Sequence, residues 1–127
     1  MKIRIYNEIQ LDGEVEIFNQ EYQSDWTQKG DYAYLIYHNE EKEKVLIKYK
    51  EDELIMNRFS TPKTLMRFIK GGQAVVVIPT PMGAQHLVTD TSRLEVAEDR
   101  IRLDYVLKPM DADAIFASYK MTITLEK

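Results

Sequence analysis

Cysteine is absent from this chain, and so are long apolar segments and an excess of basic residues. Without cysteine there is no disulfide bond, thiolate zinc site or cysteine nucleophile, which fits a reducing compartment. No segment approaches the roughly 20 apolar residues that span a bilayer, and from the polar N-terminal stretch we expect no signal peptide. The net charge of −4 argues against general nucleic-acid binding. We therefore expect one domain, residues 1–127, in the cytoplasm, with neither nucleic acid nor membrane as a partner.

Motifs of catalysis and cofactor binding are also missing. The sequence contains no G-x-S-x-G nucleophile pattern, no G-x-G-x-x-G nucleotide fingerprint and no H-E-x-x-H metal pattern. His38 and His86 have no carboxylate at a familiar spacing, and the carboxylates gather at turns, where solvated charge needs no function. We therefore expect no catalytic residue, no cofactor and no metal site.

A two-residue alternation of apolar and polar side chains covers most of the chain. It is clear in residues 44–50, 101–108 and 115–126. Successive side chains of a strand point to opposite faces, so this rhythm predicts half-buried strands. Nine turn signals separate the apolar runs, at residues 12–13, 28–31, 39–41, 51–52, 60–62, 71–72, 79–86, 98–99 and 109–111. Nine turns imply about ten strands in succession.

We expect an all-β fold, an antiparallel meander of about eight to ten strands closed into a barrel, since closure removes exposed strand edges. The stretch PTPMGAQH (79–86) matches no phosphate loop, and its prolines and glycine predict a turn between two strands. Residues 109–118 suit a loop, a strand or a short helix, and the alternation that follows favours a loop and then a strand.

Several segments resemble one known family. They are GDYAYLIY (30–37), KVLIKYKEDELIMNR (44–58), TPMG with the following TDTSRLEV (80–83 and 89–96), and YKMTITLE (119–126). On these segments the chain, over residues 14–127, resembles the YwiB-like proteins, bacterial calycin-like barrels of unknown function. Phe59 and Ser60 stand where that pattern has a small residue and a glycine. The resemblance implies a lipocalin-like barrel in a bacterial cytoplasm and supplies no catalytic residue.

Charge is unevenly distributed along the chain. Residues 54–89 contain no Asp or Glu but four basic residues, so they carry +4, while the other 13 basic and 21 acidic residues sum to −8. This segment predicts an electropositive, apolar sector that attracts an anionic ligand or an acidic partner. The alternative is that chance and core composition explain the asymmetry.

Arg58 is the main candidate for ligand binding. If residues 60–62 form a tight turn, one side of the hairpin pairs Arg58 with Thr64, Met56 with Met66, and Leu54 with Phe68. That apolar side faces inward, with Arg58 at the barrel's end. Its guanidinium suits a carboxylate, through two parallel hydrogen bonds. The alternatives are a structural ion pair with a nearby acid and a side chain that reaches out to water, and a one-residue shift would place Arg58 outside.

Aromatic residues supply the other candidates. Tyr32 and Tyr34 share one strand face, and a large ring with a polar tip suits a ligand-lined lumen or an ordinary barrel wall. Trp26 lies in a long predicted connection, QSDWTQKGD (23–31), where it caps a barrel end or anchors a partner protein. The predicted ligand-binding residues are Arg58, Tyr32, Tyr34, Met56, Met66 and Phe68, and the predicted partner-binding residues are Trp26, Lys63 and Arg67.

The expected function is therefore non-catalytic binding of a small apolar or anionic ligand in the barrel or at its mouth. The alternative is a protein-interaction module with a filled barrel, and an enzyme ranks third. The tight turn at residues 12–13 leaves no helical lid, and the many bulky inward residues predict little room for a large lipid. No residue pattern points to a particular oligomeric state.

Overall fold

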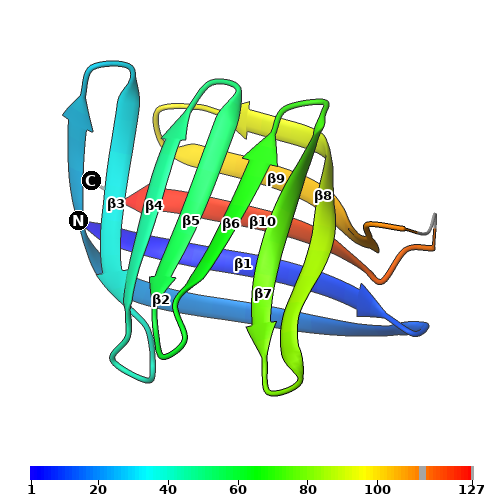
Figure 1. Cartoon of the computed structure of the whole chain (residues 1–127). Coiled ribbons are helices and arrows are strands. Elements are labelled where there is room, and N and C mark those ends of the chain that lie inside the picture. The colour runs from blue at the N-terminus through cyan, green and yellow to red at the C-terminus, as the bar shows by residue number, and fades with distance from the viewer. Residues whose placement is uncertain (112–113, 127) are drawn as a thin grey trace.

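Ten antiparallel strands make up this protein in a computed structural model that describes residues 1–111 and 114–126 (Figure 1). The strands are β1 (Lys2–Leu11), β2 (Glu14–Lys29), β3 (Tyr32–His38), β4 (Lys44–Lys50), β5 (Glu53–Phe59), β6 (Thr64–Ile69), β7 (Gln73–Thr80), β8 (Gly83–Val96), β9 (Arg100–Pro109) and β10 (Ala117–Glu126). Those residues contain no helix, and hence none that could cross a bilayer. The predicted all-β fold, its strand number and all nine turns are confirmed.

The strands form a nearly closed barrel. Each strand pairs with its neighbour along the chain, except at β6 and β7, and β1 also pairs with β10, with Lys2 opposite Glu126. The order around the sheet is β6-β5-β4-β3-β2-β1-β10-β9-β8-β7. In Figure 1, β3 to β7 lie in front of β1, β9 and β10 and cross them at a steep angle. An interior is therefore enclosed between two crossed groups of strands.

Strand β2 belongs to both groups. Its first part, up to Gln23, pairs with β1, whereas Ser24 to Lys29 pair with β3. The predicted connection at residues 23–31 is therefore wrong, since only Gly30 and Asp31 form the turn. Polar residues of low strand propensity suggested a loop here, but backbone pairing with two successive partners holds the segment extended.

The barrel has a seam between β6 and β7. No ladder joins these two strands, all of whose residues are described. The Thr89 hydroxyl of β8 instead donates a hydrogen bond to the carbonyl oxygen of Arg67 in β6, at 2.6 Å, and the Thr91 amide donates to the carbonyl of Gly72, at 3.0 Å. These contacts hold β8 against β6 where the ladder is missing.

The core follows the two-residue alternation. Every strand but β2 contributes buried apolar side chains, and the largest fully buried ones are Ile3, Leu35, Ile47, Leu54, Phe68, Leu94, Ile101, Leu103 and Ile123. Burial of such side chains is the main stabilising term of the fold. This core fills the end of the barrel near the turns at residues 30–31, 51–52 and 71–72.

Two ambiguous stretches are resolved as loops and strands. After β9 ends at Pro109, residues 110–111 form a turn, and residues 114–116 lead without regular structure into β10. The predicted loop followed by a strand is confirmed there, while Ala112 and Asp113 lie outside the described residues. The stretch at 79–86 contains the turn between β7 and β8, at Pro81 and Met82, as predicted.

Candidate functional site

A pocket of ≈ 980 Å³ lies at the opposite end of the barrel from the filled core. The β3–β4, β5–β6 and β7–β8 connections lie together at this end (Figure 1). The pocket is lined from both groups of strands, by Ile5, Asn7, Phe18, Gln20, Tyr22, Tyr37, Asn39, Glu40, Glu41, Glu43, Val45, Met56, Arg58, Ser60, Thr61, Pro62, Thr64, Met66, Ile78, Pro79, Tyr105, Leu107 and Tyr119. The lumen is thus filled at one end and hollow at the other, with more room than the sequence predicted.

The pocket exists because β2 changes partners. Residues 14–23 of β2 pair with β1 but not with β3, so the inner face of this arm extends beyond the front group of strands. Its inward residues Phe18, Gln20 and Tyr22 line the pocket. Phe18 remains 45% exposed, because no opposing strand covers it. The wall formed by β1 and β2 is therefore open to solvent.

Arg58 lies in this pocket, and the predicted register of its hairpin is confirmed. Arg58 pairs with Thr64 and Met56 with Met66, and all four residues line the pocket. The Arg58 guanidinium forms no salt bridge and no hydrogen bond with any residue in the described ranges. The structural ion pair is thus not made within that part of the chain, and Arg58 is exposed, so its side chain reaches water as the other alternative expected.

Two stacked tyrosines and a glutamate flank Arg58 at the mouth. The rings of Tyr22 and Tyr37 stack with centroids 4.7 Å apart, and the Tyr22 hydroxyl donates a hydrogen bond to the Glu40 carboxylate. Burial, together with the Glu40 charge, raises the pKa of Tyr37 to about 12, and the nearby Arg58 charge opposes this rise. The hydrogen bond from Tyr22 lowers the pKa of Glu40. Glu40 is therefore ionised at neutral pH, and both tyrosines are protonated.

The β3–β4 loop is held by its own hydrogen bonds. Asn39 Oδ1 accepts hydrogen bonds from the amides of Glu41 and Glu43, each at 3.0 Å, and Asn39 Nδ2 donates to the Glu43 carboxylate at 3.0 Å. Such side-chain bonds to following amides fix a turn locally. The loop thus places three carboxylates, those of Glu40, Glu41 and Glu43, along the pocket that contains Arg58.

A second pair of tyrosines forms the inner wall. The rings of Tyr105 and Tyr119 stack with centroids 4.6 Å apart, and burial raises the pKa of both hydroxyls. Phe68 contacts Tyr105, at 4.5 Å between centroids, but it is 1% exposed and does not line the pocket. The predicted role of Phe68 in ligand contact is therefore wrong: it supports the inner wall from the core.

Asn7 adds a polar group to the wall on β1. Its Oδ1 is buried and has no hydrogen-bond donor among the residues that the structure describes. A buried, unpaired acceptor is costly, and it is satisfied when a donor binds beside it.

Tyr32 and Tyr34 do not line the pocket. The buried residues of β3 are Ala33, Leu35 and Tyr37, so Tyr32 and Tyr34 point to the outer face. The prediction that they contact a ligand is wrong. Both faces of β3 are rich in apolar and aromatic residues, so alternation alone did not identify the inner one. Strand pairing identifies the inner face instead. Tyr37 pairs with Val45 and Val45 pairs with Arg58, so Tyr37 lies on the same side of the sheet as Arg58.

Trp26 points inward at the filled end of the barrel. Its Nε1 donates a hydrogen bond to the Tyr49 hydroxyl at 3.0 Å, and its ring packs against the core. Trp26 is half-buried with its ring directed inward, and its role as an anchor for a partner protein stays a prediction.

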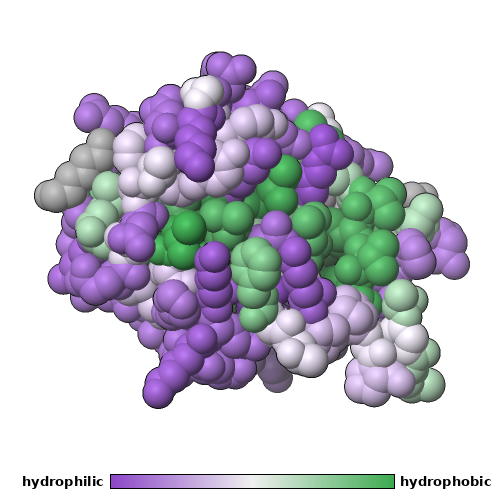
Figure 2. All heavy atoms as spheres, turned by 60° about the vertical axis from the view of Figure 1, so that its left-hand side comes forward, coloured by the Kyte–Doolittle hydropathy of each residue, from purple (hydrophilic) through white to green (hydrophobic). Residues whose placement is uncertain are grey.

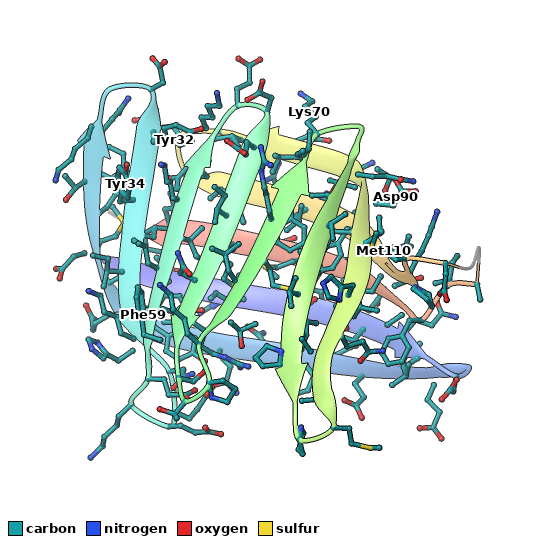
Figure 3. All side chains as sticks on the ribbon, in the orientation of Figure 1. Tyr32, Tyr34, Phe59, Lys70, Asp90 and Met110 are labelled. Atoms are coloured by element: carbon teal, nitrogen blue, oxygen red, sulfur yellow. The ribbon has the colours of Figure 1, made fainter. Side chains whose placement is uncertain are left out.

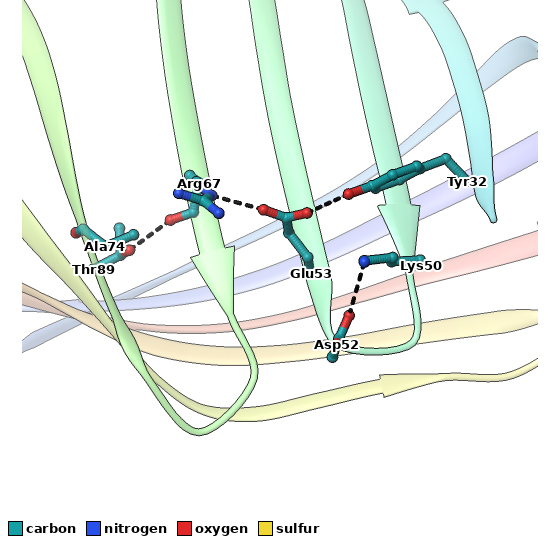
Figure 4. A network of polar contacts seen from close by, with 7 residues as sticks. All are labelled: Tyr32, Lys50, Asp52, Glu53, Arg67, Ala74 and Thr89. Atoms are coloured by element: carbon teal, nitrogen blue, oxygen red, sulfur yellow. Dashed lines mark hydrogen bonds and ion pairs between the residues drawn. The ribbon is translucent and has the colours of Figure 1, made fainter.

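Lys63 and Arg67 both lie on the outside. Lys63 lies beside the Phe59 ring, with its Nζ 4.6 Å from the centroid, and Arg67 donates a hydrogen bond to Glu53 at 2.7 Å (Figure 4). Their role in partner binding stays a prediction. Both His38 and His86 are exposed, and residues 1–111 and 114–126 contain no group of three or more potential ligands arranged for a metal.

Comparison with known proteins gives a family and a fold. The family model described as a domain of unknown function, DUF1934, matches residues 3–123. Among solved structures, the ywiB protein from Bacillus subtilis superposes with a TM-score of 0.71 and 18% sequence identity, over 99% of this chain and 91% of that chain. Similarity at this identity concerns the fold. No curated protein matches the sequence.

Proposed function

The chain belongs to the DUF1934 family, and we propose that it is a non-catalytic binding protein whose pocket holds a small molecule with an apolar body and one anionic group. In this proposal the anionic group contacts Arg58, and the body extends between the two groups of strands toward the inner wall. The proposal involves no chemical step and no cofactor.

The observation that carries the proposal is the position of Arg58. Its guanidinium lies on a wall shared with Met56, Met66 and Val45, and no carboxylate in the described residues forms a salt bridge with it. A charged group beside apolar surface is stabilised by a partner of opposite charge, and a guanidinium holds a carboxylate or sulfonate through two parallel hydrogen bonds. Thr64, directly opposite Arg58, offers a further hydroxyl.

The rim of the pocket limits the charge of the ligand. One cation and three glutamates line it, so a polyanion such as a nucleotide would be repelled once its first negative charge is paired. A ligand with a single anionic group meets Arg58 without bringing further negative charge toward Glu40 and Glu41. The pocket therefore favours an amphipathic monoacid.

The remaining walls suit the body of such a molecule. Met66, Ile78 and Leu107 provide apolar surface, and the tyrosine pair 105 and 119 provides flat rings. The volume of ≈ 980 Å³ lies near the upper end of the range, about 300–1,000 Å³, of small-molecule sites. Asn7 Oδ1 is placed to accept a hydrogen bond from a polar group on the ligand.

Two naphthalene dyes that differ in charge test the proposal. The anionic probe is 8-anilino-1-naphthalenesulfonate, and the neutral probe is N-phenyl-1-naphthylamine, which lacks the sulfonate. We expect saturable fluorescence titrations with both dyes. Arg58→Met should weaken binding of the anionic dye about tenfold or more, because a charge-assisted hydrogen bond is lost, and should leave the neutral dye unchanged.

The matched control is Arg67→Met, which removes the same charge from the outer face and should affect neither dye. Failure of both dyes to bind, or an equal loss for both dyes in Arg58→Met, would overturn the proposal.

A further inference from the structure

The outer face of β3 to β6 carries an unusual charge pattern. We call it the cationic face and define it by the outward side chains of these four strands together with Lys63 in the adjoining loop. Its aromatic members Tyr32, Tyr34 and Phe59 lie on the front strands in Figure 3. Its cations are Lys44, Lys48, Lys50, Lys63 and Arg67, whereas Glu53 is the one carboxylate on the four strands.

Three of these cations lack a carboxylate partner. Lys44, Lys48 and Lys63 form no salt bridge with any residue that the structure describes, and each instead lies over an aromatic ring. The Nζ of Lys48 is 4.2 Å from the Tyr32 centroid, and the Phe59 ring has Lys44 at 5.3 Å and Lys63 at 4.6 Å. These rings orient the ammonium groups but do not neutralise them.

The outer face of the other strands is different, because there carboxylates lie among the cations and pair with several of them. The pairs are Lys2 with Glu21 and Glu126, Arg4 with Glu21, Arg93 with Glu95 and Asp104, and Lys108 with Asp90. Arg100 and Lys120 on those strands also form no salt bridge with any described residue, so the cationic face is distinguished by its five cations against one carboxylate.

Apolar side chains run between the cations of this face. Ile36 of β3 pairs with Leu46 of β4. In the same row, Asn57 of β5 lies between Leu46 and Leu65 of β6. Leu65 is 45% exposed and Phe59 is 40% exposed. Figure 2, in which the left-hand side of Figure 1 is turned forward, shows hydrophobic surface lying between hydrophilic side chains on that side of the molecule. The face therefore offers an apolar row bordered by unmatched ammonium groups.

We propose that the cationic face docks a protein segment that combines carboxylates with apolar side chains. The carboxylates of this partner segment pair with Lys44, Lys48 and Lys63, and its apolar residues cover the row from Ile36 to Leu65. Complementary charge steers such an encounter and fixes its register, while the buried apolar row provides affinity.

A protein segment fits this face better than a nucleic acid does. Single-stranded nucleic acids bind by stacking bases on open aromatic rings, but lysines already lie over the rings of Tyr32 and Phe59. The apolar row interrupts the cations where a phosphate backbone needs continuous positive charge. The net charge of −4 on the chain also repels a long polyanion.

Fluorescence anisotropy with labelled probes tests the proposal. The probes are a short peptide of Glu, Leu and Ser, the same peptide with Gln in place of Glu, and a thymidine oligonucleotide of equal length. We expect the acidic peptide to bind the protein more tightly than either of the others. Amide chemical shifts in the NMR spectrum should change along β3 to β6.

Two triple variants make the test specific. Lys44→Gln/Lys48→Gln/Lys63→Gln should weaken binding of the acidic peptide about tenfold, since three exposed charge pairs are lost. The matched control, Lys2→Gln/Arg100→Gln/Lys120→Gln, removes equal charge from the opposite face and should have no such effect. Circular dichroism checks that both variants are folded.

The other outcomes decide against the proposal. It is overturned if the acidic and Gln peptides bind equally, if the oligonucleotide binds more tightly, if the shifts map elsewhere, or if both triple variants lose affinity alike. Concentration-dependent self-association that disappears in the first triple variant would identify a second copy as the occupant, and would likewise overturn it.

Discussion

Tyr37 shows how the pocket changes the acidity of a side chain that it buries. Its pKa rises from 10.0 to about 12, chiefly through burial. Because the folded protein holds this proton more tightly than the unfolded chain, the resulting stability is fully present below pH 10 or so. It is lost as the pH rises toward 12. The mouth of the pocket should therefore loosen in alkali.

We predict that Tyr37→Phe reduces the loss of stability at alkaline pH. The variant has no hydroxyl to ionise at this position, so its urea midpoint should fall less steeply than that of the parent protein between about pH 9 and 12. Urea unfolding at a series of pH values, followed by circular dichroism, measures the slope.

Tyr34→Phe, on the outer face, is the matched control and should keep the parental slope. Equal slopes for Tyr37→Phe and the parent protein would contradict the assigned burial. Some pH dependence should persist in Tyr37→Phe, because the pKa values of Tyr22 and Tyr105 are raised as well.

At the residue scale, the sequence identified the candidate site only where pairing could be deduced. The turn at residues 60–62 fixes one register, and it correctly placed Arg58, Met56 and Met66 on the same inner wall. No such turn argument was available for the inner face of β3, so Tyr32 was chosen although Tyr37 faces the pocket. Neither Glu40 nor Asn7 carries a local signal, because their positions depend on strands distant in sequence.

At the scale of the elements, the Thr89 side chain of β8 forms a hydrogen bond to the backbone of β6. Thr89 is fully buried, and its hydroxyl donates a hydrogen bond to the carbonyl of Arg67 at 2.6 Å, with Ala74 nearby (Figure 4). The carbonyl lies on the edge of β6 that has no ladder with β7. Thr89 therefore replaces part of the missing backbone pairing.

Thr89→Val should destabilise the protein by about 1–3 kcal/mol, because a buried carbonyl loses its donor while side-chain volume is kept. Urea unfolding gives the free energy, and hydrogen exchange should show faster exchange in β6 than in β3. Thr89→Ser keeps the hydroxyl and should lose less. If Thr89→Val were as stable as the parent protein, the hydroxyl would not support the seam.

At the element scale, the sequence predicted strands from alternation and turns from glycine, proline and acidic clusters. It failed for β2, whose second half contains Ser, Asp, Thr and Gln and is held extended by pairing with β3. It also gave no sign of the seam, since Gly71-Gly72 is the kind of turn that usually joins paired strands. Long-range contacts decide both cases, and alternation contains no information on them.

At the scale of the whole molecule, the pairing of β1 with β10 places the first and the last strand of the barrel side by side. Lys2 lies opposite Glu126. A circular permutant with the ends joined by a short glycine-serine linker, and opened between Pro81 and Met82, should therefore fold. Met82 is 98% exposed in a turn, so the new ends disturb no buried contact.

Circular dichroism and dye titration measure the outcome for the permutant. We expect a parental spectrum and binding of both naphthalene dyes within about fivefold of the parent protein, since 1 kcal/mol changes affinity by about this factor. A second permutant, opened inside β9 between Leu103 and Asp104, should not unfold cooperatively, because it interrupts two ladders. A permutant opened at Met82 that fails to fold would contradict the role assigned to the β1–β10 pair.

The same closing pair has a consequence for synthesis on the ribosome. β1 precedes β2 to β9 along the chain, yet one of its two neighbours, β10, follows all of them. Until β10 has been synthesised, the edge of β1 that pairs with it has no strand beside it. During translation this barrel should therefore expose an unpaired strand edge for a long time. Folding intermediates with such edges are prone to aggregate and are protected by chaperones.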